Sequence, residues 1–453
     1  MNWVSLFLIF LIIAPTTACK ILEVYPNPYG DEGAEYVKVW CDGSCIFTDG
    51  EDNFTVTGTA YIARNSTAFM EKFGFYPDFE GIKLSNSGED IYLICDNKTD
   101  RFNWKFYKDE GVIYYRTDRG WDFRYEDWSQ FSPVRDYVRG SIIITPAEYT
   151  LKGNGIVASY FVVEEDNFKG DFEFIVDASP VGGIPLEEYI LSKKYKFHFL
   201  SANSYKNFHY KFAVIGDRVV ITTENWKWDN RGVIVDFRSE KVADLLREVF
   251  YNDLKYESEM GKVDGSKESG NGRGKKIDFE AEIEVHVMPD SNPVFDFIEN
   301  SQDYLYIAAP YINPEWFEGA PLIDAIENAS KRGVEVKVML NDYDRNLKVA
   351  ELLNSIPNVE AKMVKSAEFD ELHAKYFVSD GKVLITTANL NKYGLKLNRE
   401  IAVVIYDQKV EEFMKNVFLE DWENKRELNA VFSLISLGFV VLIALYFIRR
   451  INK

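Results

Sequence analysis

The chain has 453 residues, which is too long for one small hydrophobic core, so we expect two or three domains. Apolar residues make up 46% of the sequence and aromatic residues 15%, a composition typical of globular rather than disordered proteins. The formal net charge of −20 argues against a protein that coats nucleic acid non-specifically, because such coating requires an excess of Lys and Arg, although a local basic cleft is still compatible with it.

Both ends of the sequence are apolar. The apolar run within residues 1–18 is too short to span a bilayer, and we predict a signal peptide that is cleaved after Ala18. Residues 429–448 carry no charge and are followed by basic residues, which predicts a C-terminal transmembrane helix; a buried core helix is the alternative. Together these segments predict a single-pass protein of the cell membrane with its folded domains on the extracellular side.

The four cysteines fit an oxidising compartment. Cys41 and Cys45 flank a short Asp-Gly-Ser turn, and we predict a disulfide between them that closes a small loop. Cys95 could then pair with Cys19, and lipidation of Cys19 is a competing interpretation.

Residues 20–137 consist of short alternating runs such as EYVKVW and EDIYLICD, broken by Gly, Asn and Asp. This pattern predicts an all-β sandwich or barrel. A second region covers residues 140–256. Residues 257–276 follow, and because they are polar, rich in Gly and Ser and without periodicity, we predict a flexible linker. In residues 277–427 strands alternate with helices, which predicts a mixed α/β sheet with helices on its faces.

One stretch occurs twice. Residues 209–226 read HYKFAVIGDRVVITTENW, residues 373–390 read HAKYFVSDGKVLITTANL, and eight of the eighteen positions are identical without a gap. We therefore interpret the second and third regions as two copies of one unit. The copies have diverged, because the first has room only for a loop where PLIDAIENASKRG predicts a helix in the second.

In each copy His-x-Lys opens a strand, so the two side chains share a face. Two-residue turns at 216–217 and 380–381 would place Lys211 opposite Thr222 and Lys375 opposite Thr386. The candidate residues are His209, Lys211, Thr222, Thr223 and Asn225 in the first copy and His373, Lys375, Thr386, Thr387 and Asn389 in the second. A cation and short donors around an imidazole form an anion site that suits phosphate, and two histidines can divide nucleophilic and general-acid work.

These motifs resemble the HKD motif of the phospholipase D superfamily: His-x-Lys, four residues, Asp, a short strand, then Gly-Ser-x-Asn. The second copy matches this pattern with Asp380, while the first has Gly216 in that place, and both copies have Thr-Thr in place of Gly-Ser. The resemblance implies that Glu400 braces the motif histidine of its own copy, His373. The first copy has Gly232 where the second has Glu400, so Asp229 or Asp236 would have to substitute.

The resemblance implies two α/β repeats that form one pseudo-twofold unit and act on phosphodiesters without a metal or another cofactor. One histidine would attack phosphorus, with His209 expected in that role, and His373 would protonate the leaving oxygen; the sequence does not fix this order. The expected substrate is a phospholipid or a nucleic acid, the expected state is a monomer, and the alternative is a cell-surface binding protein without catalysis. Thr222, Thr223, Thr386 and Thr387 would contact the substrate.

The opening ILEVYPNPYGDEGAEYVKVWCDG (21–43) resembles the start of a lamin tail domain, an immunoglobulin-like β-sandwich. The resemblance implies a domain that binds or positions a partner, and no residue indicates which. The complete expectation is a β-sandwich, two phospholipase D-like repeats and a C-terminal transmembrane helix.

Overall fold

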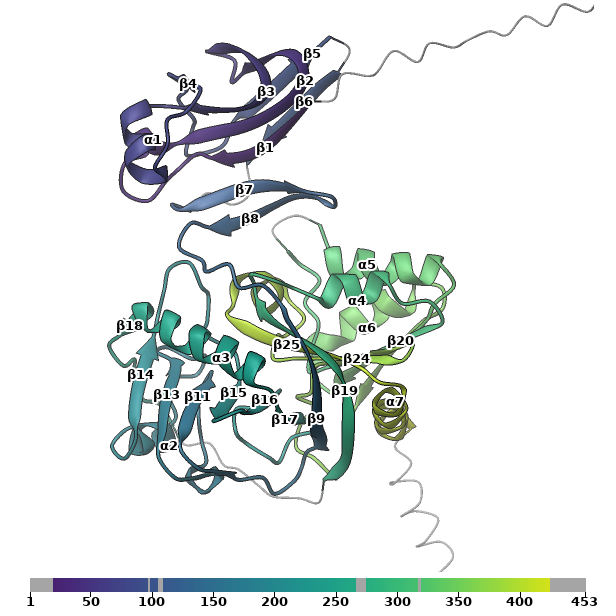
Figure 1. Cartoon of the computed structure of the whole chain (residues 1–453). Helices are drawn as coiled ribbons and strands as arrows, with labels where there is room; N and C mark the ends of the chain where they lie inside the picture. Colours follow the sequence, from purple (N-terminus) through teal and green to yellow (C-terminus); the bar gives the residue numbers. More distant parts are fainter. Residues whose placement is uncertain (1–18, 97, 105–108, 266–273, 317–318, 424–453) are drawn as a thin grey trace, which may run out of the picture. The chain divides into compact units, whose positions relative to one another are not determined.

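The computed structural model describes residues 19–96, 98–104, 109–265, 274–316 and 319–423. The chain divides into two compact units, Met1–Trp128 and Ser129–Lys453, which are described separately (Figure 1).

The N-terminal unit is built on an eight-stranded sheet in which six strands follow the order β4-β3-β2-β1-β7-β8, while β5 pairs with β2 and β6. Its strands are β1 (Cys19–Tyr25), β2 (Tyr36–Thr48), β3 (Asn53–Ala63), β4 (Phe79–Glu80), β5 (Asp90–Cys95), β6 (Lys98–Asn103), β7 (Val112–Thr117) and β8 (Gly120–Tyr125). Helix α1 (Ser66–Phe73) begins where the Asn65 side chain accepts a hydrogen bond from the backbone N–H of Ala68, and it ends at Gly74 in the left-handed conformation. The predicted β-rich character of this region is confirmed, with α1 added, but its boundary is at Trp128 rather than residue 137.

The predicted disulfide between Cys41 and Cys45 is wrong. Both cysteines lie on the single long strand β2, and Cys45 instead bonds to Cys95, its register partner on β5, at a Cα–Cα separation of 4.5 Å. Cys19 and Cys41 face each other on β1 and β2 as buried thiols. A disulfide joins neighbouring strands here because residues opposite each other in an antiparallel pair have close Cβ atoms.

The C-terminal unit is organised by one fifteen-stranded sheet in the order β18-β14-β13-β11-β15-β16-β17-β9-β19-β25-β24-β23-β20-β21-β22. The first-copy strands are β9 (Val134–Ile144), β11 (Gly155–Ser159), β13 (Phe172–Asp177), β14 (Lys196–Leu200), β15 (Phe212–Ile215), β16 (Arg218–Thr222), β17 (Val233–Arg238) and β18 (Glu257–Ser258); β10 (Leu151–Lys152) and β12 (Phe168–Lys169) form a separate pair. The second-copy strands are β19 (Lys275–Met288), β20 (Tyr304–Ala309), β21 (Glu335–Asn341), β22 (Val359–Val364), β23 (Tyr376–Ser379), β24 (Lys382–Thr386) and β25 (Glu400–Tyr406). The order is nearly a mirror image about the contact of β9 with β19, so the two copies share one sheet.

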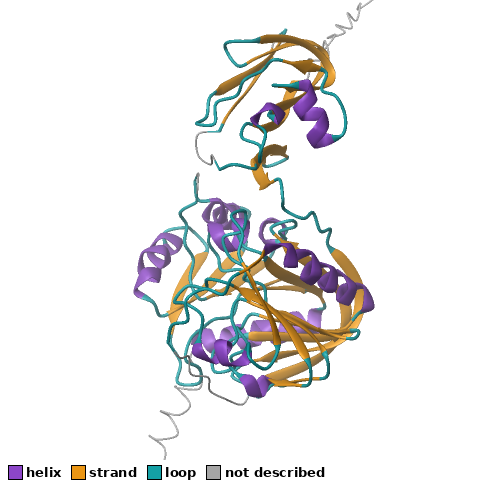
Figure 2. Ribbon diagram, turned by 90° about the vertical axis from the view of Figure 1, so that its left-hand side faces the viewer, coloured by secondary structure: helices purple, strands orange, loops and turns teal. Residues whose placement is uncertain are grey.

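The helices of this unit are α2 (Leu186–Leu191), α3 (Glu240–Asp253), α4 (Val294–Glu299), α5 (Pro321–Lys331), α6 (Leu347–Asn354) and α7 (Gln408–Glu423). Figure 2 shows the helices arranged around the strands. In the second copy α5 links the parallel strands β20 and β21, as predicted. In the first copy the parallel strands β11 and β13 are joined without an α-helix, which confirms the predicted divergence.

The predicted linker, residues 257–276, is wrong at both ends. Residues 257–258 form β18 against β14, and Lys275 already begins β19, which pairs with β9 over Lys275–Val285. Residues 134–137, assigned from the sequence to the first domain, lie in β9 and therefore belong to this shared sheet. These segments become strands because they pair with strands that are distant in the sequence. A local pattern of polar residues contains no information about such pairing.

The predicted fold class was wrong in its last element. In the part of the chain that the structure describes, no helix is both long enough and apolar enough to cross a membrane, so the C-terminal transmembrane helix is not supported. The segments on which the two terminal predictions rest, residues 1–18 and 429–448, lie outside the described residues.

The Cys45–Cys95 bond predicts a measurable contribution to stability. The bond joins residues 50 positions apart in the sequence. Its removal should lower the free energy of unfolding by about 4 kcal/mol, because the unfolded chain gains conformational entropy when a loop of this size is no longer closed. Cys95→Ser should therefore lower the midpoint of denaturant unfolding of the N-terminal unit, whereas Cys41→Ser, which removes only a buried thiol, should lower it much less. Equal effects of the two substitutions would contradict this assignment.

Candidate active site

The two repeated hairpins have the register that the sequence predicted. Ile215 pairs with Arg218 and Ser379 with Lys382, so both turns contain two residues. The backbone N–H of Thr222 donates to the carbonyl of Lys211, and the N–H of Thr386 donates to that of Lys375, each at 3.0 Å. His-x-Lys stands directly before the strand in each copy, so the chemical groups cluster at one end of each hairpin.

Backbone contacts between the copies bring the two clusters together. The N–H of His209 donates to the carbonyl of Arg399 at 2.9 Å, and the N–H of His373 donates to the carbonyl of Arg231 at 3.0 Å. Each histidine is thus hydrogen-bonded to the backbone just before a strand of the opposite copy, His209 before β25 and His373 before β17. The ammonium group of Lys375 lies 3.4 Å from the carbonyl of Thr223, so the second lysine also reaches the first hairpin.

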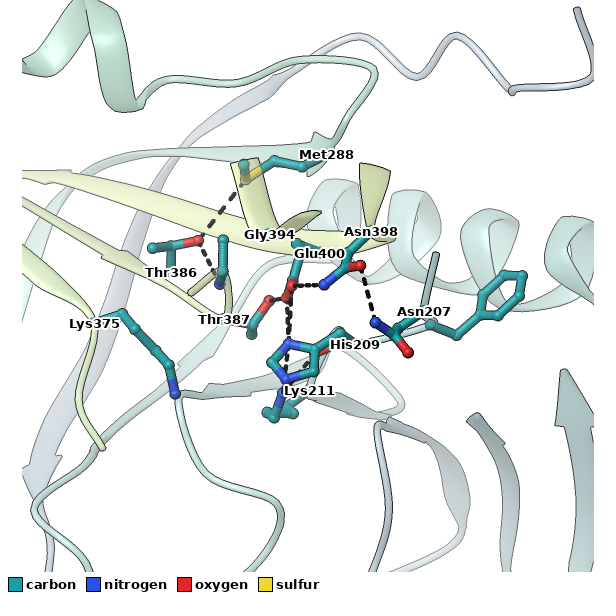
Figure 3. Close-up of polar contacts among 12 residues, drawn as sticks. Asn207, His209, Lys211, Met288, Lys375, Thr386, Thr387, Gly394, Asn398 and Glu400 are labelled. Atoms are coloured by element: carbon teal, nitrogen blue, oxygen red, sulfur yellow. Dashed lines mark hydrogen bonds and ion pairs between the residues drawn. The ribbon is translucent and has the colours of Figure 1, made fainter. Parts of the chain in front are cut away.

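Glu400 contacts the histidine of the other copy, which corrects the prediction that it braces His373. Nδ1 of His209 lies 2.8 Å and 2.9 Å from the two carboxylate oxygens of Glu400 (Figure 3). The Thr387 hydroxyl donates to Glu400 at 2.5 Å and the side-chain amide of Asn398 at 3.0 Å. With Nδ1 donating its proton to the carboxylate, Nε2 of His209 is the basic nitrogen.

Glu224, which the sequence analysis missed, plays the same part for His373. Nδ1 of His373 lies 3.0 Å and 3.1 Å from the two oxygens of Glu224. The hydroxyl of Thr223 donates to this carboxylate at 3.1 Å and the amide of Asn230 at 3.2 Å. The two sites are therefore built from the same set of groups: a threonine, an asparagine and a histidine around one fully buried glutamate.

The carboxylates come from different positions of the repeat. In the second copy the glutamate follows the Asn-Arg pair 398–399, whereas in the first copy Gly232 follows Asn230-Arg231 and the glutamate follows Thr223 instead. A Cβ atom on Gly232 would lie 2.3 Å from Oε1 of Glu224, so the Glu224 side chain fills the space that a residue-232 side chain would occupy. The predicted substitutes are elsewhere: Asp229 pairs with Lys227 and Asp236 with Arg218.

Both lysines are buried beside their histidines. Nζ of Lys211 donates to the carbonyl of His209 at 2.6 Å, and Nζ of Lys375 donates to that of His373 at 2.7 Å. Burial lowers the pKa of Lys211 to about 7 and that of Lys375 to about 8, with the carboxylates of Glu400 and Glu224 opposing the shift in both. Two cations concentrated at one buried place favour an anionic ligand.

Burial also lowers the pKa of both histidines. The pKa of His209 falls to about 4 although Glu400 opposes the shift, and that of His373 falls in the same direction against Glu224. For Glu224, burial acts to raise the pKa, but the neighbouring His373 and Lys375 more than offset it and hold the pKa at about 2. At neutral pH the site therefore contains neutral imidazoles and ionised carboxylates.

The remaining candidates divide into two groups. Asn225 and Asn389 stand just beyond the hairpins, and the buried Oδ1 atom of each, a hydrogen-bond acceptor, lacks a partner among the described residues. The four threonines are fully buried and bonded inside the protein, contrary to the predicted contact with substrate. Thr222 and Thr386 accept from the backbone N–H groups of Glu224 and Ala388, while Thr223 and Thr387 hold the carboxylates.

Asp380 is not part of the cluster, which contradicts its predicted catalytic role. It lies exposed on the turn between β23 and β24, where its carboxylate accepts from the backbone N–H groups of Gln302 and Asp303 at 2.7 Å and 3.2 Å. His373 and Lys375 precede β23, at the other end of the strand. Asp380 therefore fixes the start of β20 rather than the chemistry.

Buried ion pairs lock the copies around the site. The guanidinium of Arg399 binds Asp253 at the end of α3 with two contacts of 3.0 Å, and that of Arg231 binds Asp421 in α7 at 2.8 Å. Each pair joins an arginine of one copy to the last helix of the other. Since these arginines also carry the carbonyls that hold His209 and His373, the ion pairs fix the position of both imidazoles.

Comparison with known proteins gives matches to the second copy. Residues 294–422 match the family model described as "Cardiolipin synthase, PLD-like domain". A cardiolipin synthase of Listeria welshimeri is 30% identical over 134 residues, and one of Clostridium perfringens is 30% identical over 135 residues. The match covers 29% of this chain and 27% of either relative, so the chain spans about a quarter of their length.

Two solved structures are similar at lower identity. Phosphatidylserine synthase of Haemophilus influenzae is 13% identical, with a TM-score of 0.43, over 60% of this chain and 80% of that one. Nuc of Salmonella typhimurium, a phospholipase D family member, is 22% identical, with a TM-score of 0.27, over 31% of this chain and 93% of that one. The family match and the cardiolipin synthase relatives support the phospholipase D superfamily; none of these comparisons tests the resemblance of residues 21–43 to a lamin tail domain.

The exchanged carboxylates predict a rescue by double substitution. Glu224→Ala should lower kcat about 100-fold, because His373 loses the group that orients it, and Gly232→Glu should be similarly damaging because its side chain collides with Glu224. The double variant recreates the arrangement of the second copy, with Ala after the threonines and Glu after Asn-Arg, and should recover to within about 10-fold of the parent.

Steady-state turnover of a generic phosphodiester would measure this effect, with folding checked by thermal unfolding. Additive losses in the double variant would show that Glu224 does not stand in for a residue-232 carboxylate.

Proposed function

We propose that this chain is a phosphodiesterase or phosphatidyltransferase of the phospholipase D type that works through a phosphohistidine. The observation that carries the proposal is the meeting of two His-Lys-Asn sets, in which Nδ1 of each histidine lies within hydrogen-bond distance of a buried glutamate and Nε2 lies beside the ammonium group of a lysine. Two imidazoles with the same tautomer and two buried lysines suit a phosphoryl group between them.

In the first step Nε2 of His209 attacks phosphorus, the bond from phosphorus to the leaving oxygen breaks, and Nε2 of His373 gives its proton to that oxygen. Lys211 and Lys375, with the amides of Asn225 and Asn389, would bind the phosphoryl oxygens. In the second step His373 takes a proton from water or an alcohol, whose oxygen attacks phosphorus and releases His209. Water gives hydrolysis and an alcohol gives transfer, so the acceptor decides the outcome.

The assignment of His209 as nucleophile is supported by an asymmetry in burial. The ring of Tyr160 lies 4.6 Å from that of His209, centroid to centroid, whereas Pro310 holds the equivalent place after β20. The side chain of His209 is 7% exposed and that of His373 19%. The more buried imidazole is the one more strongly held in the neutral form that a nucleophile requires.

Two substrate classes fit this proposal. The cardiolipin synthase relatives favour a phospholipid, in which case transfer to a lipid alcohol is the expected reaction. The phospholipase D-like nuclease alternative requires nucleic acid, and the non-catalytic alternative requires no turnover at all. The buried Cys45–Cys95 bond favours an oxidising compartment, consistent with the proposed extracellular location.

The histidines should behave as one unit. His209→Asn and His373→Asn should each lower turnover of bis(p-nitrophenyl) phosphate by about 1000-fold or more, and the double variant should be little worse than either, because residues of one mechanism are strongly non-additive. His373→Asn should accumulate a phosphoryl adduct on His209, detectable by mass spectrometry. His198→Asn is the matched control, since His198 bonds Glu173 and Glu257 on a separate edge of the sheet. Substantial turnover in His209→Asn alone would disprove the shared mechanism.

The pH profile of kcat/KM should be bell-shaped, with an acidic optimum. His209 must be neutral and its pKa is about 4, while His373 must be protonated and its pKa lies below the ordinary 6.5, so the optimum should fall between these values. Glu400→Gln removes a charge that raises the pKa of His209 and should move the acid limb to lower pH. Glu224→Gln should move the alkaline limb to lower pH. Exchange of these two effects would show that His373 is the nucleophile.

A further inference from the structure

The N-terminal unit contains a pocket that the proposed chemistry does not use. It has a volume of about 420 Å³ and is lined by residues of α1 and of strands β1, β2, β3, β7 and β8. Strand pairing sets its floor, because Lys38 lies opposite both Tyr61 and Glu23, and Arg124 lies opposite Ile113. A pocket of this volume is large enough for a ring with a charged group attached.

One wall of the pocket is aromatic. The rings of Tyr61 and Phe75 meet nearly perpendicular at 5.1 Å, and Phe69 completes the corner at 5.1 Å from Phe75. Phe75 is 44% exposed, although it is a large apolar side chain, whereas Phe69 is fully buried. The corner therefore offers one ring for stacking and a second ring as an edge contact.

The charges of the pocket favour an anion. Three cations, Lys38, Lys72 and Arg124, stand against two carboxylates, Glu23 and Glu126, which leaves one net positive charge in a chain whose net charge is −20. Lys72 is already paired with Glu126 at 2.9 Å, and the hydroxyl of Tyr36 donates to Glu23 at 2.9 Å.

Two of the three cations make no ion pair with a carboxylate of the described residues, although the charge of Lys38 also interacts with Tyr61 and Glu23. Arg124 is half-buried, and among the residues the structure describes no carboxylate forms an ion pair with Arg124 or Lys38. Nζ of Lys38 lies 5.1 Å from the centre of the Tyr61 ring, so this cation stands directly beside the aromatic corner.

We infer that this pocket binds a nucleotide unit of a single nucleic-acid strand, with the base stacked on Phe75 and the phosphate bound by Lys38 and Arg124. Stacking on an aromatic ring combined with a cation for the phosphate is the arrangement by which proteins hold single strands without reading their sequence. The inference names nucleic acid as the substrate class and in that respect rests on the proposed phosphodiesterase function.

Binding of fluorescein-labelled oligothymidylate to the full chain tests this inference. The parent for this measurement carries His209→Asn and His373→Asn, so that the strand is not cleaved. Arg124→Gln and Phe75→Ala should each weaken binding about 10-fold, and Arg124→Gln should reduce the slope of log K against log salt by about one. Two substitutions outside the pocket are matched controls and should leave binding unchanged: Lys20→Gln, an exposed cation on β1, and Ile94→Ala, whose exposure of 44% equals that of Phe75.

The outcomes separate this inference from the proposed catalysis. Pocket variants made with intact histidines should turn over bis(p-nitrophenyl) phosphate like the unsubstituted chain. The inference would be overturned if neither pocket substitution weakened the binding of oligothymidylate. It would also be overturned if the chain did not bind the oligonucleotide but bound anionic phospholipid vesicles, and Phe75→Ala and Arg124→Gln abolished that binding. If the unsubstituted chain did not turn over bis(p-nitrophenyl) phosphate but oligothymidylate binding was as expected, only the catalytic proposal would be overturned.

Discussion

The rest of the C-terminal unit depends on one kind of contact, in which the imidazole of each copy bonds to a glutamate carboxylate of the other copy. Glu224 and Glu400 are both fully buried, and a buried carboxylate is strongly unfavourable unless hydrogen bonds and opposite charge replace its lost hydration. Each glutamate obtains a hydroxyl, an amide and an imidazole N–H, and a lysine stands nearby. Such a set is stable only when it is complete, because the removal of one donor leaves a buried charge without its partner. The groups that form the candidate site are therefore also a condition for its folding.

This requirement explains why the two copies form one sheet rather than two adjacent domains. His209 must reach Glu400, and His373 must reach Glu224, so the two hairpins have to be held in register with each other. The long pairing of β9 with β19 supplies a rigid centre. Two ion pairs then hold the segments before β25 and β17 against the last helix of the other copy: Arg399 binds Asp253, and Arg231 binds Asp421. Buried pairs of this kind contribute little net stability, but they exclude alternative alignments, since a shifted register would leave a charge buried alone.

The sequence predicted what depends on local pattern and missed what depends on distant contacts. The hairpin turns, the Lys-Thr register and the missing first-copy helix follow from residues within one segment, and all three are confirmed. The partner of Glu400 was wrong because the correct histidine lies 191 residues away in the other copy. Cys45 was paired with a near neighbour, although its strand partner is Cys95. The sequence contains one signal for Glu224: directly after Thr-Thr the first copy has a glutamate where the second has Ala388, and it lacks a glutamate at Gly232.

That exchange also explains how the two halves of the candidate site can differ in sequence while each histidine keeps a buried glutamate at Nδ1. The histidine requires a carboxylate beside Nδ1. A glutamate can place its carboxylate there from either of two chain positions, after Thr-Thr as in Glu224 or after Asn-Arg as in Glu400. Once Glu224 occupies the space, residue 232 has to be glycine, because any Cβ atom would collide with the carboxylate. The two positions are therefore constrained together, and neither can change alone without the loss of a completed buried set. A sequence pattern that fixes the glutamate at one place matches the second copy, as the family match over residues 294–422 does, while the first copy satisfies the same electrostatic requirement through a residue outside that pattern.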